Sequence, residues 1–371
     1  MNFWLISAFY LLIAFLGVGI FLWGKPDGDS LFDRLYRCVC VYCPRLLKKL
    51  LEKCCGKRAP AALDAAWVYI CYTCNPIVQI FYLAVVIGGY LSFVQYGYPH
   101  LPNQYVGGWH KYTGFCVFLA CVFTWWTACR RDPGTINERN VDEYCTLFEW
   151  DNQIFSSAMC ETCQVVKPAR SKHCALCNIC VARFDHHCIW INNCVGLGNH
   201  RWFLGFLFVH LGLCFYGGSL GSIIIYEVIK QKDLFNAVFV DPVTKQRHVA
   251  SKLIIVQYML ATEGPMIFVA ALCFIMGIAL CGFFVWHLNL VRIGTTTNEL
   301  SKWQYVKWCL KQEGEESKWK DVRNIYNNGL IANLREVFFP PINTNSVVKG
   351  QEAPEEPSAQ GNKSRKAKKH D

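Results

Sequence analysis

The feature that most constrains this chain is a dense cluster of metal-binding side chains. Seven cysteines and three histidines lie within the 35 residues from Cys160 to Cys194. Structural zinc is held tetrahedrally by four thiolate or imidazole ligands, and CxxC pairs followed by His and Cys at short spacing are its usual pattern. Side chains alternate faces along an extended chain, so His173 and Cys174 are expected to serve different zinc ions. Two zinc sites need eight ligands, which leaves two ligand-type side chains for another role.

The same alternation applies to the tetrad at residues 185–188, Asp-His-His-Cys. If His187 turns towards a metal, His186 and Cys188 project together on the opposite face. A neighbouring imidazole lowers the pKa of a thiol, and an acid behind the ring orients it, so Asp185 is the candidate orienting acid. The alternative is that His186 and Cys188 are extra zinc ligands in a non-catalytic knuckle.

A longer pattern around the cluster resembles a known family. It reads Cys160-x2-Cys163-x3-Lys167-Pro168-Ala169-Arg170-x2-His173-Cys174-x2-Cys177-x2-Cys180-x4-Asp185-His186-His187-Cys188-x-Trp190-x2-Asn193-Cys194-x-Gly196-x2-Asn199. This pattern is similar to the cysteine-rich domain of the DHHC-type protein S-acyltransferases, the palmitoyltransferases. Ile189 departs from it, because many members have Pro there. Neither side chain is a ligand or a proton donor, so we expect little effect on the chemistry.

The resemblance implies a role for each ligand-type residue. One zinc ion would be held by Cys160, Cys163, His173 and Cys180. The second zinc ion would be held by Cys174, Cys177, His187 and Cys194. Cys188 would be the acylated nucleophile, His186 its base and Asp185 the residue that orients His186.

Composition independently places the chain in a membrane. Of its 371 residues, 53% are hydrophobic and only 17% are charged, which is too apolar for an ordinary soluble domain. Stretches of about 20 apolar residues span a bilayer as helices. The candidate spans are Phe3 to Trp23, Ile77 to Tyr96, Tyr112 to Cys129, Trp202 to Glu227 and Pro265 to Val291.

The ends of two spans need comment. The first span has no basic residues before it and is long for a signal peptide, so we expect a retained helix. The apolar run that leads into the last span begins at Leu253, and Glu263-Gly264-Pro265 is expected to break it. The part before the break is expected at the membrane interface or at an edge of the helix bundle.

Basic residues predict the orientation in the membrane. Segments 24–76, 130–201 and 292–371 carry 31 of the 37 Lys and Arg residues, so these segments are expected in the cytosol. Cytosolic thiols are kept reduced, so we expect the 22 cysteines to be largely unbridged. The net charge of +10 fits contact with anionic leaflets. No basic stripe interleaves with exposed aromatic residues, so nucleic-acid binding is not expected.

The predicted fold class is an all-α multi-pass membrane protein, with about five transmembrane helices, that carries a small cytosolic zinc-stabilised cysteine-rich domain. The predicted segments are an N-terminal helix (1–23), a basic Cys-rich cytosolic loop (24–76), two spans (77–129), the cytosolic DHHC zinc domain (130–201), two spans around a lumenal loop at 228–252 (202–291), a cytosolic motif region (292–345) and a disordered basic tail (346–371).

This topology suggests how the reaction is arranged. Cys188 lies a few residues before the span that begins at Trp202, so it is expected near the cytosolic membrane face. A long acyl chain could lie within the helix bundle, with Trp190 beside it and coenzyme A in the cytosol. We expect acyl transfer from acyl-CoA, such as palmitoyl-CoA, to Cys188 and then to a cytosolic cysteine of a membrane-associated protein substrate.

Two other function classes are weighed against this enzyme. The first is a zinc-stabilised membrane scaffold or adaptor without catalysis, which would need only the eight zinc ligands and not Asp185, His186 and Cys188. The second is a transporter, which is disfavoured because no span carries Lys or Arg at its centre.

Three further motifs extend the resemblance. Asp132-Pro133-Gly134 follows the third span and Thr296-Thr297-Asn298-Glu299 follows the last, as the DPG and TTxE motifs of the family do. Tyr326-x2-Gly329-x3-Asn333-x4-Phe338 resembles the family's C-terminal motif, which packs the tail onto the membrane domain. Three features make the chain resemble one branch of this family, that of zinc finger DHHC domain-containing protein four. They are the additional N-terminal helix, the C-terminal ending and Ile189.

Two terminal features bear on location and modification. The chain ends Lys368-Lys369-His370-Asp371, which resembles a dilysine retrieval signal of endoplasmic-reticulum membrane proteins, although a solvated basic tail is the alternative. The first cytosolic loop carries a second group of cysteines, for which S-acylation and unmodified thiols both remain open. This group is Cys38, Cys40, Cys43, Cys54 and Cys55.

Overall fold

The computed structural model describes residues 25–240 and 246–341, in two compact units that meet after Asn75. The predicted N-terminal span at Phe3 to Trp23 lies outside the described residues, and so do the basic tail and its dilysine ending. Each unit is described separately below.

The N-terminal unit is helical. It contains α2 (Leu31–Tyr36), the π-helix η1 (Arg37–Tyr42), α3 (Cys43–Cys55) and α4 (Arg58–Tyr72). Ser30 starts α2 with a capping box, because its hydroxyl accepts from the Asp33 amide while the Asp33 carboxylate accepts from the Ser30 amide. Lys48 of α3 pairs with Asp64 of α4. The cysteine group singled out in the sequence, Cys38, Cys40, Cys43, Cys54 and Cys55, is exposed.

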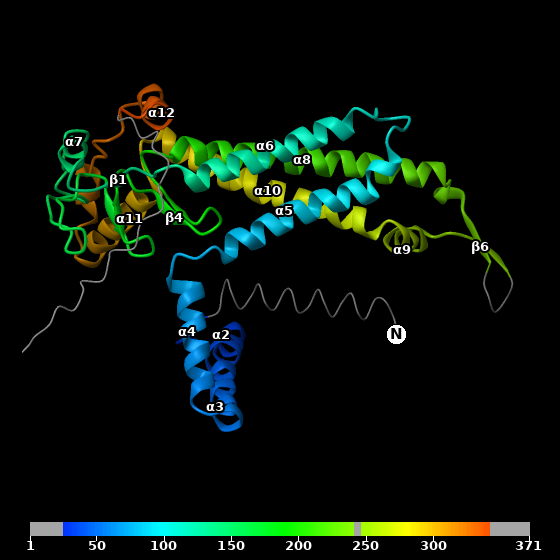
Figure 1. Ribbon diagram of the computed structural model, residues 1–371, viewed down its shortest axis with the longest axis horizontal. Helices are drawn as coiled ribbons and strands as arrows, with labels where there is room; N and C mark the ends of the chain where they lie inside the picture. The colour runs from blue at the N-terminus through cyan, green and yellow to red at the C-terminus, as the bar shows by residue number, and fades with distance from the viewer. Residues whose placement is uncertain (1–24, 241–245, 342–371) are drawn as a thin grey trace, which may run out of the picture. The chain divides into compact units, whose positions relative to one another are not determined.

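The second unit contains four long apolar helices, and Figure 1 shows them running lengthwise. They are α5 (Ile77–Tyr96), α6 (His110–Arg130), α8 (His200–Gln231) and α10 (Gly264–Arg292). Each is long and apolar enough to cross a membrane, so the four spans predicted within the described residues are confirmed as helices of spanning length. Helix α8 packs along both α6 and α10, and α10 also contacts α5.

One helix end differs from the sequence expectation, and one predicted break is confirmed. Helix α8 continues to Gln231, past the predicted end at Glu227, because Gln231 and Gln104 hydrogen-bond to the Glu227 carboxylate and satisfy its charge. The predicted break near Pro265 is present: α9 (Lys252–Thr262) ends before Glu263, and α10 starts at Gly264 with Pro265 in its first turn. The predicted loop at 228–252 includes the hairpin of β6 (Val238–Val240) and β7 (Arg247–Val249).

The cysteine-rich domain follows α6 and is built from short strands and turns. Strands β1 (Thr135–Ile136), β3 (Ile179–Val181) and β2 (Lys172–Cys174) form an antiparallel sheet in the order β1-β3-β2. Strands β4 (His186–Cys188) and β5 (Asn193–Val195) form a separate hairpin, and the short helix α7 (Val141–Cys145) lies between β1 and β2 in the sequence. The strands are too short to bury a large core, so the domain depends on additional links.

Three C-terminal elements follow α10, and the first and third of them contact the cysteine-rich domain. They are α11 (Thr297–Gln312), the 3₁₀-helix η4 (Glu316–Asp321) and α12 (Leu330–Phe338). Asn333 of α12 donates to the Arg292 carbonyl at the end of α10, and Arg201 donates to the Phe338 carbonyl. The C-terminal motif therefore joins the ends of the long helices, as the sequence predicts. The fold is that of a multi-pass helical membrane protein with a cysteine-rich domain.

Candidate functional site

The first metal-ligand group is assembled by strand pairing. His173 on β2 lies directly opposite Cys180 on β3, and cross-strand partners share one face of a sheet. The turn that holds Cys160 and Cys163 brings two more thiols to this face. The Nδ1 atom of His173 lies 3.6 Å from Cys160 Sγ, 3.3 Å from Cys163 Sγ and 3.8 Å from Cys180 Sγ. Tetrahedral zinc places sulfur and nitrogen ligands about 3.6 Å apart, so this group fits a zinc ion.

The second group repeats the arrangement on the other hairpin. His187 on β4 lies opposite Cys194 on β5. Its Nδ1 atom is 3.8 Å from Cys174 Sγ, 3.2 Å from Cys177 Sγ and 3.7 Å from Cys194 Sγ. This is also the separation that a tetrahedral zinc ion imposes. The structure thus brings together the two predicted sets of four ligands, and His173 and Cys174 fall in different sets as expected.

A local backbone feature recurs in both CxxC turns. The residue after the second cysteine adopts a left-handed conformation, with φ of 53° at Gln164 and 54° at Asn178. Non-glycine residues rarely adopt positive φ, so this conformation is imposed by the turn. It folds the chain back so that the amide of Cys163 points at Cys160 Sγ, 3.4 Å away. Such N–H groups stabilise thiolates, which are the form that binds zinc.

The face of β4 opposite His187 carries the candidate reactive groups. Alternation along the strand places His186 and Cys188 together, as the sequence predicts. The Nδ1 atom of His186 lies 2.6 Å from Oδ2 of Asp185, a charge-assisted hydrogen bond. Cys188 is only 7% exposed and packs in an apolar cluster with Phe203 and other residues of the long helices. The thiol is therefore held at the junction of the cysteine-rich domain and the helix bundle.

The protonation states of Asp185 and His186 are coupled. Burial acts against the charged form of both groups, but their mutual hydrogen bond and opposite charges outweigh it. The pKa of Asp185 therefore lies well below its usual value, and the pKa of His186 rises to about 9. The Cys188 side chain contributes to the rise in the His186 pKa. A protonated His186 ring is suited to pair with a thiolate at Cys188.

The start of α11 fixes the Asp185 carboxylate. The Thr297 backbone amide donates to Oδ1 at 2.8 Å, and the Thr297 hydroxyl donates to Oδ2 at 3.1 Å. Thr296 caps the helix and donates its hydroxyl to the Phe184 carbonyl. A helix N-terminus stabilises a neighbouring negative charge. The Thr296–Glu299 motif therefore contacts the cysteine-rich domain at Phe184 and Asp185.

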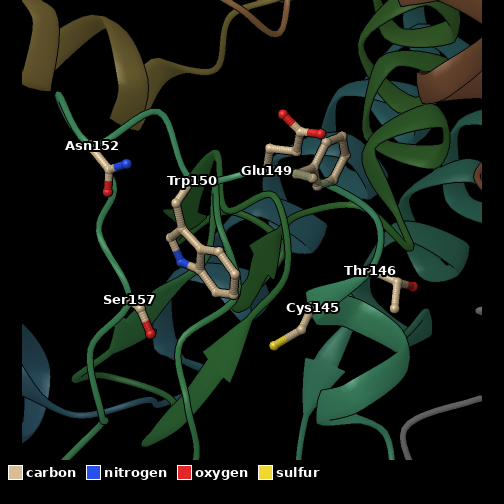
Figure 2. A pocket seen from close by; sticks show the side chains of 7 residues that line it. Cys145, Thr146, Glu149, Trp150, Asn152 and Ser157 are labelled. Atoms are coloured by element: carbon tan, nitrogen blue, oxygen red, sulfur yellow. The ribbon is translucent and has the colours of Figure 1, made fainter.

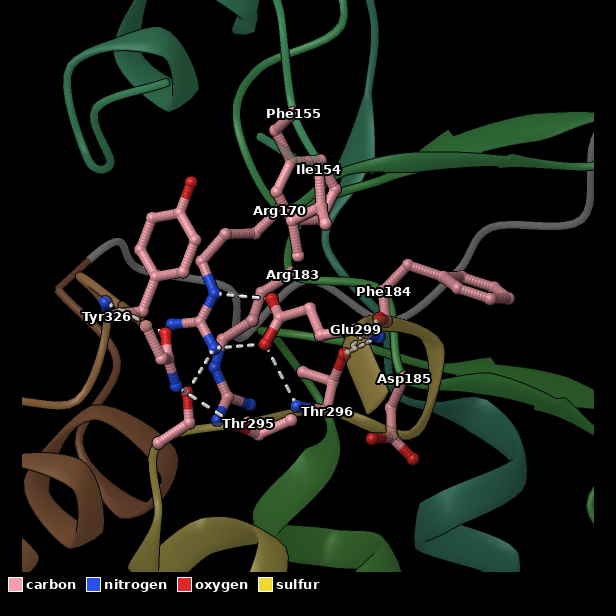
Figure 3. A network of polar contacts seen from close by, with 12 residues as sticks. Ile154, Phe155, Arg170, Arg183, Phe184, Asp185, Thr295, Thr296, Glu299 and Tyr326 are labelled. Carbon is pink, nitrogen blue, oxygen red and sulfur yellow. Dashed lines mark hydrogen bonds and ion pairs between the residues drawn. The ribbon is translucent and has the colours of Figure 1, made fainter. Parts of the chain in front are cut away.

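A buried ion-pair network ties the same motif to the domain core (Figure 3). The fully buried guanidinium of Arg170 donates to both carboxylate oxygens of Glu299, at 2.6 Å and 2.9 Å. It also donates to Glu336 of α12 and packs against the Tyr326 ring. A bidentate Arg–carboxylate pair fixes orientation as well as charge, so α11 and α12 are held in register with the cysteine-rich domain. Both residues belong to motifs that the sequence shows, but the sequence alone does not predict that they pair.

The loop after Cys188 is hydrogen-bonded to the long apolar helices. Trp125 of α6 donates to the Trp190 carbonyl at 3.1 Å, and Gln79 of α5 donates to the Ile191 carbonyl at 2.8 Å. Asn193 donates to the Arg131 carbonyl just past the end of α6. These bonds satisfy backbone groups that a helix end and a tight loop leave unpaired. They hold Cys188 at the end of the helix bundle.

An apolar cavity of about 450 Å³ lies within the bundle. Its wall is almost entirely apolar and is formed by α5, α6, α8 and α10 together with Trp190. Tyr82 and Leu280 line the cavity and also pack against the cluster that contains Cys188. The cavity thus borders the cluster that contains Cys188, and Trp190 is part of its wall. Its size and lining suit a long hydrocarbon chain.

A second cavity, of about 390 Å³, is shown in Figure 2. It lies in the cysteine-rich domain around Cys145, Glu149 and Trp150. None of its lining residues belongs to the two ligand sets or to the Asp185–Cys188 segment. We assign it no part in the chemistry.

The Asp132-Pro133-Gly134 motif also lies against the domain. Asp132 Oδ1 accepts from the Gly134 and Thr135 amides, which forms a tight turn, and Gly134 has φ of 97°. The Gly134 carbonyl accepts from Ala182, and the Pro133 carbonyl accepts from Gly198. The turn therefore leads the chain from α6 into β1 beside the second hairpin.

Comparison with known proteins agrees with this geometry. A family model described as DHHC palmitoyltransferase matches residues 153–304. The chain is 30% identical to palmitoyltransferase swf1 of Schizosaccharomyces pombe, over 88% of this chain and 94% of the relative. It is 30% identical to palmitoyltransferase SWF1 of Neurospora crassa, over 91% of this chain and 92% of the relative. Identity to palmitoyltransferase ZDHHC4 of Bos taurus is also 30%, over 57% of this chain, and the match spans 63% of that relative.

Two of these relatives align along nearly their whole length, and the family match covers both ligand sets, the Asp-His-His-Cys tetrad and the start of α11. The chain therefore belongs to the DHHC palmitoyltransferase family, whose activity is protein S-acyl transfer.

Proposed function

We propose that Cys188 is the residue that carries the acyl group, with His186 as its base and Asp185 as the acid that orients His186. The observation that carries this proposal is the alternation along β4. His187 on one face completes a set of four zinc-type ligands, while His186 and Cys188 share the other face beside Asp185. A scaffold would need only the eight metal ligands.

The first step forms an acyl-enzyme. His186 takes the proton of the Cys188 thiol, and the thiolate attacks the carbonyl carbon of an acyl-CoA such as palmitoyl-CoA. A bond forms between Cys188 Sγ and the acyl carbon, and the bond to the coenzyme A sulfur breaks. His186 gives its proton to the departing thiolate, which leaves His186 neutral. Asp185 holds the ring in place through the 2.6 Å bond to Nδ1, so that Nε2 faces the thiol.

The second step passes the acyl group to a substrate protein. Neutral His186 takes the proton of a substrate cysteine, and the resulting thiolate attacks the thioester on Cys188. Cys188 leaves as a thiolate that again pairs with protonated His186. One thioester replaces another in each step, so little chemical driving force is needed.

The apolar cavity is the proposed site of the acyl chain. Burial of a methylene group is worth about 0.8 kcal/mol, so a chain of about sixteen carbons can gain on the order of 10 kcal/mol before entropic losses. Trp190 lies in the cavity wall and its carbonyl is held by Trp125, so its ring is positioned beside the chain. This arrangement keeps the thioester carbon at Cys188 and the polar coenzyme A outside the bundle.

Zinc ions bound by the two proposed ligand sets would have a structural role. Each set supplies four thiolate or imidazole ligands, which closes a tetrahedral site and leaves no position for a catalytic water. His173 and His187 each present Nδ1 to three sulfurs. The ligands fix the two hairpins, and the β4 hairpin in turn fixes His186 and Cys188.

The substrates are proposed to be membrane-associated proteins with cysteines at the cytosolic face. Cys188 lies close to the first turn of α8, so a substrate thiol must approach the end of the helix bundle. The endoplasmic-reticulum membrane is the proposed compartment, on the Lys368-Lys369 pair in a segment expected in the cytosol.

The test is labelling of the purified protein with palmitoyl-CoA, followed by intact-mass analysis and peptide mapping of the hydroxylamine-sensitive adduct. Wild type should carry the adduct on Cys188 with two zinc ions per chain, and Cys188→Ser should lose the adduct while keeping both ions. Cys129→Ser is the matched control, because Cys129 packs against the same apolar cluster but belongs to neither ligand set. An undiminished adduct in Cys188→Ser, or loss of zinc in that variant, would leave the scaffold as the better explanation.

A further inference from the structure

Two buried histidines that the proposed reaction does not use face Asp185. His200 is the first residue of α8, and His287 lies near the end of α10. These three side chains are each 1% exposed, and a ligand-type atom from each lies within 4.8 Å of the others. Nε2 of His200 and both ring nitrogens of His287 have no hydrogen-bond partner among the residues that the structure describes. Buried polar groups without partners are costly, so their position calls for a functional explanation.

The Asp185 carboxylate can accept one more hydrogen bond. An ionised carboxylate offers about four acceptor positions. Three are taken, by Nδ1 of His186 and by the amide and hydroxyl of Thr297. The two histidines lie on the side of Asp185 that faces the membrane helices, and Nδ1 of His287 is 3.9 Å from Oδ2.

Arg183 determines which nitrogen of His200 carries the proton. The guanidinium of Arg183 donates to Nδ1 of His200 at 2.9 Å. An arginine can only donate, so Nδ1 of His200 must accept and the proton of the neutral ring lies on Nε2. The nitrogen that remains to act on Asp185 is therefore an N–H donor.

Arg183 is itself held by the C-terminal helix. Its side chain is fully buried, and its Nε donates to Glu336 of α12, which also accepts from Arg170 at 2.9 Å. Figure 3 shows Arg183 between Arg170 and Asp185. A chain of contacts thus runs from α12 through Arg183 to His200, and a ring nitrogen of His200 lies within 4.8 Å of an Asp185 carboxylate oxygen.

We propose that His200 is a positioning residue for acyl transfer: fixed by Arg183 as the Nε2–H tautomer, it directs a donor at the Asp185 carboxylate and so keeps His186 aligned with Cys188. This inference rests on the proposed roles of Asp185, His186 and Cys188. A metal ion is the competing occupant for this donor set. A protonated nitrogen has no lone pair for a metal, and the ion would lie beside the buried cation of Arg183.

Two amide substitutions separate the two sides of the His200 ring. His200→Gln places an amide near the position of Nε2 and keeps a donor towards Asp185. His200→Asn places an amide near the position of Nδ1 and keeps only an acceptor for Arg183. In acyl-enzyme formation from palmitoyl-CoA, the Asn variant should lose about 10-fold or more in kcat with little change in KM, which is the effect of one hydrogen bond to a charged group. The Gln variant should lose no more than about 3-fold.

If His200 served only to accept the hydrogen bond from Arg183, the Asn variant would be active and the Gln variant impaired. That result would overturn the inference. An Asn variant that loses zinc or melts well below the Gln variant would also overturn it, because His200 would then serve folding. Three metal ions per wild-type chain, falling to two in His200→Asn, would assign the cluster to a metal instead.

His248→Asn is the control for a generic His-to-Asn effect, since His248 is exposed on β7. Cys188→Ser, measured alongside, separates the two claims. An adduct that persists in Cys188→Ser overturns the proposed function. A reversed order of the His200 variants, with an adduct that still requires Cys188, overturns the role of His200 alone.

Discussion

The two zinc-type hairpins of the cysteine-rich domain share one design and differ in what their central strands carry. In each, a CxxC turn with a left-handed residue precedes a strand whose histidine lies opposite a cysteine of the next strand. On β2 the neighbours of His173 are an exposed lysine, Lys172, and a ligand of the second set, Cys174. On β4 the neighbours of His187 are His186 and Cys188. On the proposed roles, the hairpin is a support, and the reactive groups lie on the reverse face of β4.

The surroundings of the two hairpins differ as well. Strand β4 is bordered by the N-terminus of α11, which fixes Asp185, and by the loop that α5 and α6 hold. Strand β2 pairs with β3, and α11 and α12 reach this part of the domain through Arg170, two residues before the strand. On the proposed roles, the β4 hairpin differs because α11 holds Asp185 itself and α5 and α6 hold the loop that follows Cys188.

The largest effect is expected from removal of the ligand that supports the reactive strand. His187→Ala should lose one zinc ion and reduce acyl-enzyme formation below detection, because zinc binding supplies about 10–16 kcal/mol of folding free energy in small domains. His187→Cys should keep two zinc ions and recover much of the activity, since a fourth thiolate can replace imidazole. Zinc analysis and palmitoyl-CoA labelling check both.

The corresponding change on the other hairpin sharpens the comparison. His173→Cys should also keep both zinc ions and remain active. A His187→Cys protein with full zinc and no activity would contradict a purely supporting role for His187 and would blur the distinction between the two hairpins.

A smaller but still large effect is expected at Asp185. Asp185→Asn should slow acyl-enzyme formation by about 10²–10⁴-fold with zinc retained, because the ring of His186 loses its orienting charge. The pKa of His186, raised to about 9 in the wild type, should fall. Alkylation of Cys188 by iodoacetamide, followed against pH, checks this shift: reactivity that persists at neutral pH in the wild type should require higher pH in the variant.

The same pair affects stability with a defined sign. The pKa of His186 is raised on folding, so its contribution is fully present below about pH 6.5 and is lost as pH rises through about 9. The difference in thermal stability between wild type and His186→Ala should therefore shrink between these values. A difference that grows with pH would contradict the proposed ion pair between His186 and Asp185.

Sequence reasoning succeeded where a local rule decided the geometry. Alternation along a strand is enough to separate His173 from Cys174, and His187 from His186 and Cys188. The apolar runs likewise located four helices of spanning length within the described residues. These features depend on neighbouring residues and on hydropathy alone.

Long-range contacts were beyond those rules. Arg170 and Glu299 are 129 residues apart, and nothing in either segment shows that both are buried and paired. In the sequence, nothing distinguishes His200 and His287 from other residues near helix ends. Only the packing of α8 against α10 brings them close to Asp185. The residues of the cavity wall could not be predicted either, because the sequence of a uniformly apolar helix does not show which residues face inward.

The smallest predicted effect tests the cavity beside the reactive hairpin. Gly88 and Gly89 are neighbours on α5, and a methyl group added at either would meet no atom within 4 Å, yet only Gly89 lines the cavity. Gly89→Leu should fill part of the cavity and shift the preference from sixteen-carbon to shorter acyl chains by about 10-fold, whereas Gly88→Leu should leave it unchanged. The measurement is competitive labelling with acyl-CoAs of different length. An equal shift in both variants would show that α5 acts through general packing, and the cavity would then no longer distinguish the environment of Cys188.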